Sequence, residues 1–215
     1  MAFLAQIPVS LWALLLPAQG LLLKLAAGKA VAQASPTLWY LTRAMAVSSY
    51  VALTLSVLLG TLRAIARKAS ERLSWVVDEL HQFIATLAGV LIVGHLLTLL
   101  LDPFLPFSLL NLLLPLDEPY RPTAVVIGVF SFYGMALLLL TSWLRRRLRY
   151  SWWRAIHYLS FVTFALVTAH GWLAGSDSGE PWMRAIYAGA ASAIAFLILV
   201  RFFVGAPSAA QVQPR

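Results

Sequence analysis

The sequence contains no cysteine, which excludes iron–sulfur clusters, thiolate-ligated heme and disulfide bonds. Charged residues are scarce as well: they make up 11% of the chain, whereas soluble domains carry roughly 25%. The sequence also lacks a Gly-rich phosphate-binding loop, a regular internal repeat and room for a soluble domain between its apolar runs. We therefore expect no flavin or nicotinamide site within this chain.

Apolar residues are abundant, at 61% of the chain. Six apolar runs each meet the ~20 residues that cross a bilayer as a helix. They cover about 3–23, 37–62, 74–101, 123–144, 152–174 and 183–204. This pattern predicts an all-α integral membrane protein, a six-helix transmembrane bundle. Pro8, Pro17 and Gly20 interrupt the first run, whose start lacks the basic flank of a cleavable signal peptide, so we expect a broken or tilted span there.

Lysine and arginine mark the cytoplasmic loops of membrane proteins. Nine basic residues lie around the connections after the second and fourth runs: Arg63, Arg67, Lys68, Arg72, Arg145, Arg146, Arg147, Arg149 and Arg154. Most acidic residues lie in the other connections. Those connections also contain three basic residues that argue against an outer position, Lys24, Lys29 and Arg121. We expect a multi-pass protein of the inner (plasma) membrane with both termini cytoplasmic. The net charge of +8 then reflects topology and anionic membrane lipid, and we expect no nucleic-acid partner.

All four histidines lie in two of the predicted spans. His81 and His95 are fourteen residues apart in the third span, and His157 and His170 are thirteen apart in the fifth. The members of each pair are separated by about 20 Å along a helix axis, so they cannot share one metal ion. Both spans run in the same direction, which places His81 near His157 in one leaflet and His95 near His170 in the other. Two imidazoles from neighbouring helices are a common axial ligand set for heme iron.

Other functions are compatible with histidines in a membrane. A single buried histidine is most often a structural hydrogen-bonding residue, and several can serve proton relay or substrate transport. A relay usually includes carboxylates at mid-depth, whereas Asp78 and Glu79 lie at the rim of the third span. The helix face is weaker evidence for a shared function, because a spacing of thirteen residues places His157 and His170 about 140° apart around an ideal helix. Two bis-histidine hemes are the favoured hypothesis, and transport stays open as the alternative.

Longer strings in the sequence resemble the ferric reductase-like transmembrane domain, the heme core of ferric reductases, NADPH oxidases and the membrane subunit of the bacterial methionine sulfoxide reductase system. Besides the histidine spacing, these strings are LWYLTRAMAVSSYVALTLSVLLG, PFSLLNLLLP, LRRRLRYSWWRAIHYLSF and AHGWLAGSDSGEPW. They are similar to the stand-alone bacterial members of the family. The resemblance covers about residues 37–204, between an N-terminal apolar segment at 1–36 and a cytoplasmic tail at 205–215.

This resemblance implies two b-type hemes, one bound by His81 with His157 and the other by His95 with His170. Arginines are expected to steady the heme propionates: Arg43 at the outer side, and Arg63, Arg72 or Arg154 at the inner side. Phe161 and Phe164 lie between the two histidine levels and are candidates for a place between the macrocycles. Ordinary packing is the alternative for both rings.

The resemblance also implies a heme-dependent transmembrane oxidoreductase subunit. Full-length ferric reductases and NADPH oxidases continue into a flavin- and nicotinamide-binding domain, whereas this sequence ends at Arg215. We expect electrons to come from a separate flavoprotein or a quinone and to reach an outer acceptor such as a ferric chelate, dioxygen or a periplasmic reductase. A quinone-linked diheme cytochrome b that feeds a periplasmic reductase is the alternative.

Overall fold

The computed structural model describes residues 36–102, 107–114 and 120–205. The described chain is helical and contains no strand. Its helices are α2 (Pro36–Ala69), α3 (Glu71–Leu101), α4 (Leu109–Leu113), α5 (Pro122–Trp143), α6 (Tyr150–His157), α7 (Leu159–Ala174) and α8 (Pro181–Gly205). The predicted first span at 3–23 and the tail after Gly205 lie outside the described residues.

Five segments are long and apolar enough to cross a membrane: Pro36–Arg63, Glu71–Leu101, Pro122–Trp143, Tyr150–Ala174 and Pro181–Val200. Each matches one of the predicted runs within a few residues. The all-α transmembrane bundle predicted from the sequence is therefore confirmed. Large apolar side chains such as Phe83, Val90 and Phe196 are more than half exposed, as expected for the surface of a multi-pass membrane protein that lipid covers.

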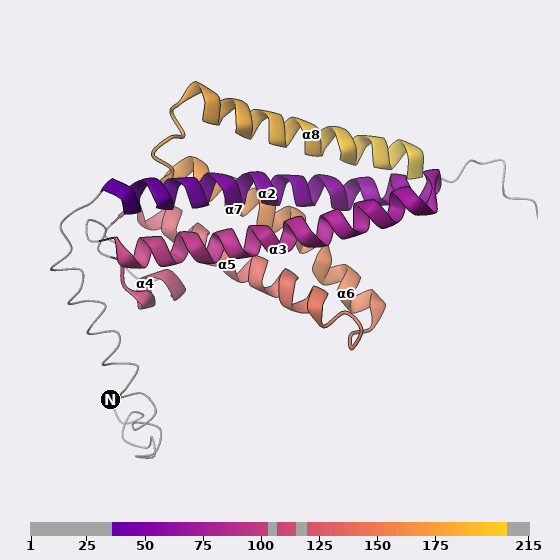
Figure 1. The fold of residues 1–215 in the computed structure, drawn as a ribbon, viewed down its shortest axis with the longest axis horizontal. Helices are drawn as coiled ribbons and strands as arrows, with labels where there is room; N and C mark the ends of the chain where they lie inside the picture. The colour runs from indigo at the N-terminus through magenta and orange to yellow at the C-terminus, as the bar shows by residue number, and fades with distance from the viewer. Residues whose placement is uncertain (1–35, 103–106, 115–119, 206–215) are drawn as a thin grey trace, which may run out of the picture.

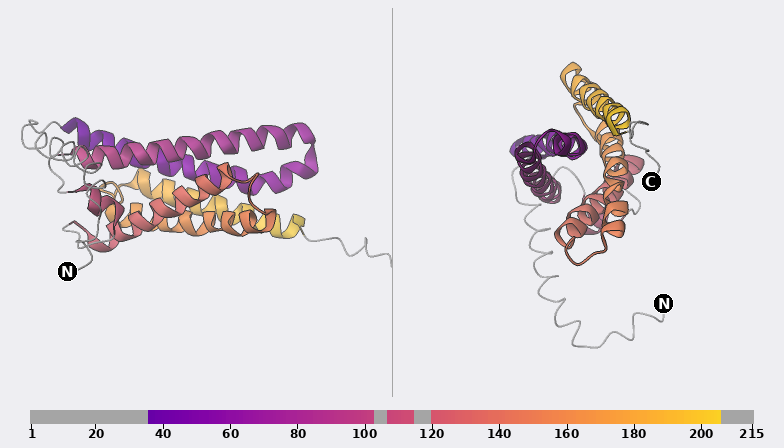
Figure 2. Two further views of the ribbon diagram at one scale, coloured as in Figure 1. Left: turned by 90° about the horizontal axis from the view of Figure 1, so that it is seen from below. Right: turned by 90° about the vertical axis from the view of Figure 1, so that its right-hand side faces the viewer.

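The long helices lie side by side as a bundle (Figures 1 and 2). Helix α2 runs along α3 over most of its length, α5 packs against α7, and α8 lies against α2. The starts of α2, α5 and α8 lie at the same end as the ends of α3 and α7, and the short α4 lies at this end too. Helix α6 lies at the opposite end of the bundle. Helices α3 and α7, which carry His81, His95 and His170, thus run in the same direction, as the sequence predicted.

Local sequence explains where the helices begin and end. Pro36, Pro122 and Pro181 each occupy the first position of a helix, where the missing N–H costs nothing and the fixed φ angle is already helical. The Ser70 side chain caps α3 by accepting a hydrogen bond from Leu73 N at 3.1 Å. Only Ser70 separates α2 from α3, so these two helices form a tight hairpin.

The basic connections differ from the loops that the sequence suggested. Helix α2 continues to Ala69, and Arg72 lies in the first turn of α3. Alanine, arginine and lysine are good helix formers, and residues 64–69 contain no glycine or proline to end the helix. Arg154 likewise lies on α6 and not in a loop. The first basic connection is therefore a helical hairpin and not an open loop.

The fifth span is interrupted between its two histidines. Helix α6 ends at His157, Tyr158 forms a turn, and α7 begins at Leu159. At this break Phe161 N bonds to Tyr158 O, a three-residue spacing that tightens the turn. The ideal-helix angle of about 140° therefore does not apply to His157 and His170.

A compact core lies between the helices. Tyr50 and Leu53 on α2 pack with Met135 on α5, Phe164 on α7 and Tyr187 on α8. Buried hydroxyl groups in this apolar region bond to carbonyls of their own helix, as Thr54 does to Tyr50 O at 2.8 Å. This packing fixes the long helices against one another and so fixes the level of each histidine.

Candidate functional site

The four histidines line two pockets, one toward each end of the bundle. The first, called here the His81–His157 pocket, has a volume of about 320 Å³ and is bordered by α2, α3, α5, α6 and α7. The His81 and His157 ring centroids are 6.1 Å apart and their planes meet at 84°. Two imidazoles on opposite sides of one metal ion hold their nitrogens about 4 Å apart, and their ring centres lie farther apart still. The 6.1 Å between the His81 and His157 centroids agrees with such an arrangement.

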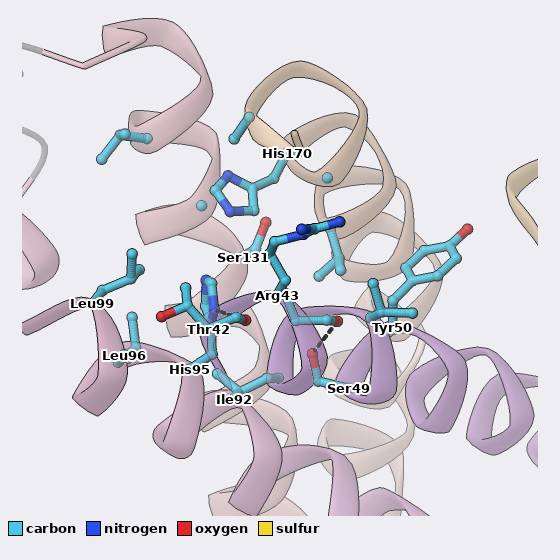
Figure 3. Close-up of a pocket in the computed structure, with 18 of the residues that line it drawn as sticks. Thr42, Arg43, Ser49, Tyr50, Ile92, His95, Leu96, Leu99, Ser131 and His170 are labelled. Carbon is cyan, nitrogen blue, oxygen red and sulfur yellow. Dashed lines mark hydrogen bonds between the residues drawn. The ribbon is translucent and has the colours of Figure 1, made fainter. Parts of the chain in front are cut away.

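The second, called here the His95–His170 pocket, has a volume of about 270 Å³. Figure 3 shows His95 reaching into it from α3 and His170 from α7, with Arg43 of α2 nearby. Leu96, Leu99 and Val129 give it apolar walls. The structure thus groups His81 with His157 and His95 with His170, the grouping predicted from helix direction.

Three of the histidines share one hydrogen-bonding arrangement. Nδ1 of His81 lies 2.9 Å from Ser56 O, that of His95 lies 3.1 Å from Thr42 O, and that of His170 lies 2.7 Å from Ala124 O. A carbonyl oxygen only accepts, so Nδ1 is the protonated nitrogen and Nε2 keeps its lone pair.

Histidines that bind metals usually have this arrangement, in which a second group fixes the tautomer and turns the free nitrogen toward the metal. The sequence analysis did not identify these partners. They are backbone atoms on the neighbouring helices α2 and α5, and no side-chain pattern marks them.

Glycines make room for two of the imidazoles. A Cβ atom added to Gly128 on α5 would lie 2.6 Å from Cε1 of His170, and one added to Gly60 on α2 would lie 3.2 Å from Cε1 of His81. The first distance is shorter than a tolerable contact, and the second is tight. Gly128 and Gly60 thus belong to the histidine sites. Small residues are common in membrane helices, and the sequence analysis did not identify these two as part of a site.

Two of the arginines that line the pockets, Arg43 and Arg63, are paired with aspartates. Arg43 forms a two-bonded ion pair with Asp177, including Nε to Oδ2 at 2.9 Å, and its guanidinium lies 4.1 Å from the Trp39 ring centroid. Arg63 pairs with Asp78, with Nη2 at 2.7 Å from Oδ2. An arginine already bonded in this way can bind a ligand carboxylate only by sharing or leaving its aspartate.

The other predicted arginines lie apart from the pockets. Arg72 and Arg154 are exposed and line neither pocket. The Arg154 guanidinium bonds to the hydroxyl of Tyr158, one turn along, with Nη2 to O at 3.1 Å. Helix α6 directs Arg154 away from the His81–His157 pocket even though it is only three residues from His157.

The two predicted phenylalanines have different positions. Phe161 is half-buried and lines the His81–His157 pocket. Phe164 is buried in the core, where it stacks on Tyr50 with centroids 5.8 Å apart and planes at 24°. Tyr50 in turn lines the His95–His170 pocket. The two rings therefore lie in the apolar layer between the pockets, and Phe164 contributes to its packing.

Among the described residues there is no group of three or more histidine, aspartate or glutamate side chains that could hold a metal ion. Each pocket offers two imidazoles and apolar walls, a donor set suited to a flat apolar ligand with a central metal. A comparison with protein families identifies the class of protein to which this arrangement belongs. The model of the ferric reductase-like transmembrane component matches residues 45–168. This chain belongs to that family.

The ferric reductase-like match includes His81, His95 and His157, and it ends two residues before His170. Comparison with the curated proteins gave no significant match, and neither did comparison with solved structures. Family membership makes this chain a multi-pass membrane protein with the role of an oxidoreductase heme core. The cofactor number, the residues that bind the cofactors and the direction of electron flow are matters for the proposal below.

Proposed function

We propose that this ferric reductase-like chain binds two b-type hemes, one in each pocket, and transfers electrons across the membrane between them. When bound, the hemes supply one-electron exchange between ferric and ferrous iron. The observation that carries the proposal is the Nδ1–carbonyl bond of His81, His95 and His170. These bonds leave Nε2 as the free ligand atom on three histidines that line the two pockets.

The protein's own residues prepare each pocket for such a ligand. Each pocket would hold the heme iron through the two histidines that line it, so no third protein ligand would be needed. Leucine, valine and aromatic side chains exclude water and suit the apolar faces of a macrocycle. Arg43 and Arg63 are each near a pocket and close to an aspartate, and we propose that they share their charge with the ligand's carboxylates.

The distribution of acidic residues favours electron transfer over proton relay. Between residues 80 and 101, the part of α3 that carries both histidines, the sequence has no aspartate or glutamate. Helices α5 and α7 contain none along their whole lengths. A proton path through the middle of the described bundle would therefore lack the carboxylates that such relays commonly use.

We further propose a direction and partners. Electrons enter at the His81–His157 pocket from a separate flavoprotein or a quinone on the cytoplasmic side of the inner (plasma) membrane. They leave at the His95–His170 pocket, where the acceptor is a ferric chelate, dioxygen or a periplasmic reductase. The arginine-rich stretch at 145–149 lies near the first pocket, and Arg145 lines it, which supports a cytoplasmic position for that end.

Heme content tests the proposal directly. The purified protein is expected to contain about two b-type hemes per chain, because each histidine pair would hold one iron. Its reduced absorbance spectrum is expected to show the sharp bands of low-spin iron. Extracted heme divided by protein concentration measures the ratio. A ratio near one contradicts the two-site proposal, and a colourless protein contradicts heme binding altogether.

The orientation has an independent test, because the native chain has no cysteine. Single cysteines at Ser70 and Ser176 lie at opposite ends of the bundle, and both positions are exposed. In whole cells, a membrane-impermeant thiol reagent is expected to label the Ser176→Cys protein and not the Ser70→Cys protein. Permeabilised cells provide the control, in which both variants react. The reverse pattern in whole cells would invert the proposed direction of electron flow.

A further inference from the structure

The four histidines are not held in the same way. Among the described residues, Nδ1 of His157 is buried and has no hydrogen-bond partner, whereas Nδ1 of each other histidine bonds to a backbone carbonyl. Without that bond, an imidazole is free to turn about its terminal torsion and to carry its proton on either nitrogen. A different contact has to keep the His157 ring facing His81.

Trp153 makes that contact. Its ring lies on the His157 ring with centroids 5.0 Å apart and planes at 22°, a stacked arrangement. Trp153 precedes His157 by four residues on α6, the spacing that places two side chains on one face of a helix. Tyr150 backs the indole from the preceding turn, with centroids 5.8 Å apart and planes at 34°. The three rings form one column that ends at His157.

The position of His157 explains why stacking replaces a hydrogen bond. His157 is the last residue of α6, and the chain turns at Tyr158 before α7 begins. The neighbouring helix α2, whose Thr42 and Ser56 carbonyls serve His95 and His81, provides no such partner for His157. Trp153 lies on the same short helix as His157 and lines the same pocket.

We propose that Trp153 is the positioning residue of the His81–His157 site. Its indole face fixes the plane of the His157 ring, the task that a backbone carbonyl performs for the other three histidines. This inference rests on the proposed function only for the identity of the ligand, a heme. Trp153 itself does not bind the iron.

The experiment compares Trp153→Leu, Trp153→Phe and Trp152→Leu with the parent protein. Trp153→Leu removes the stacked ring, and Trp153→Phe keeps a ring of smaller area. Trp152 is the neighbouring residue on α6 and is 64% exposed, so Trp152→Leu is the matched control. The readouts are heme content and the low-spin EPR signal of the oxidised protein, which depends on the angle between the two axial imidazole planes. That angle is 84° for His81 and His157.

Trp153→Leu is expected to weaken heme binding in the His81–His157 pocket by about 10-fold or more, as loss of a supporting contact to a metal ligand commonly does. The remaining EPR signal of that site is expected to shift or broaden, because the His157 plane is no longer fixed. Trp153→Phe is expected to keep the parent signal, and so is Trp152→Leu. The heme of the His95–His170 pocket stays in all variants and shows that each protein is folded.

Two results would overturn the inference while leaving the proposed function intact. In one, Trp153→Leu keeps both the heme content and the EPR signal of the parent. In the other, Trp153→Phe loses the site as completely as Trp153→Leu does, which means that stacking is not what holds His157. A parent protein without heme overturns the proposed function, and the inference with it.

Discussion

Replacing either His95 or His170 with alanine is expected to remove the same heme. Each change takes one of two strong axial ligands from the His95–His170 pocket, and the described part of that pocket offers no third histidine, cysteine or carboxylate cluster to replace it. The affected heme is lost or becomes high-spin, and heme content falls from about two per chain to about one. Heme extraction and the reduced spectrum of each folded variant measure this change.

Replacing His81 or His157 is expected to affect the other heme, and the kinetic result differs. With the His95–His170 site altered, a cytoplasmic donor is expected to reduce one heme and stop. With the His81–His157 site altered, neither heme is reduced quickly by that donor, although dithionite reduces the remaining one. If His95→Ala and His170→Ala abolish different hemes, the pairing across α3 and α7 is wrong, and the two-site proposal with it.

The sequence was sufficient to predict the five described spans and the level of each histidine. Apolar runs of about 20 residues or more have few alternatives to a transmembrane helix, and α3 and α5 begin and end within three residues of the predicted runs. Helix direction then placed His81 with His157 and His95 with His170. The third and fifth spans are separated by one span, so they run in the same direction and their histidines lie at matching levels. Long transmembrane helices of this kind can be predicted without information on tertiary contacts.

The arginines and the supporting groups were not readable in this way. Arg72 and Arg154 have the same basic character as Arg43 and Arg63, but the rotation of each helix about its own axis decides which of them reaches a pocket. Rotation depends on how neighbouring side chains interlock. The same is true of Asp177, which is 134 residues from Arg43 in sequence and pairs with it in space. The sequence analysis did not identify Asp177 as a partner of Arg43.

The backbone partners of the histidines show most clearly what the sequence alone cannot predict. A histidine that binds a metal usually has its second nitrogen held by another group, and three of the four histidines bond to a backbone carbonyl. Which carbonyl serves depends on the register between adjacent helices and leaves no mark in the sequence. His157 departs from the pattern because the helix that carries it ends there.

The second large effect is expected from a single methyl group at Gly128. Gly128→Ala places a Cβ atom 2.6 Å from Cε1 of His170 and 2.7 Å from its Nδ1, so the imidazole has to move away from α5. The bond from His170 Nδ1 to Ala124 O is lost or lengthened as the ring moves. Metal–ligand distances vary by only about 0.2 Å, so a displaced imidazole binds less well, and we expect heme affinity in the His95–His170 pocket to fall about 10-fold or more.

A graded series separates this effect from general destabilisation. Gly60→Ala brings its Cβ to 3.2 Å from His81 Cε1 and is expected to have a smaller effect, confined to the other pocket, whereas nothing lies within 4 Å of a Cβ at Gly189 on α8. Overpacking at Gly128 costs about 1–3 kcal/mol, and the change from glycine to alanine within a helix returns up to about 1 kcal/mol. Global stability is therefore expected to change less than heme binding does. Heme content and thermal unfolding of Gly128→Ala, Gly60→Ala and Gly189→Ala test the order. Equal loss of heme in all three variants would show that Gly128 does not shape the position of His170.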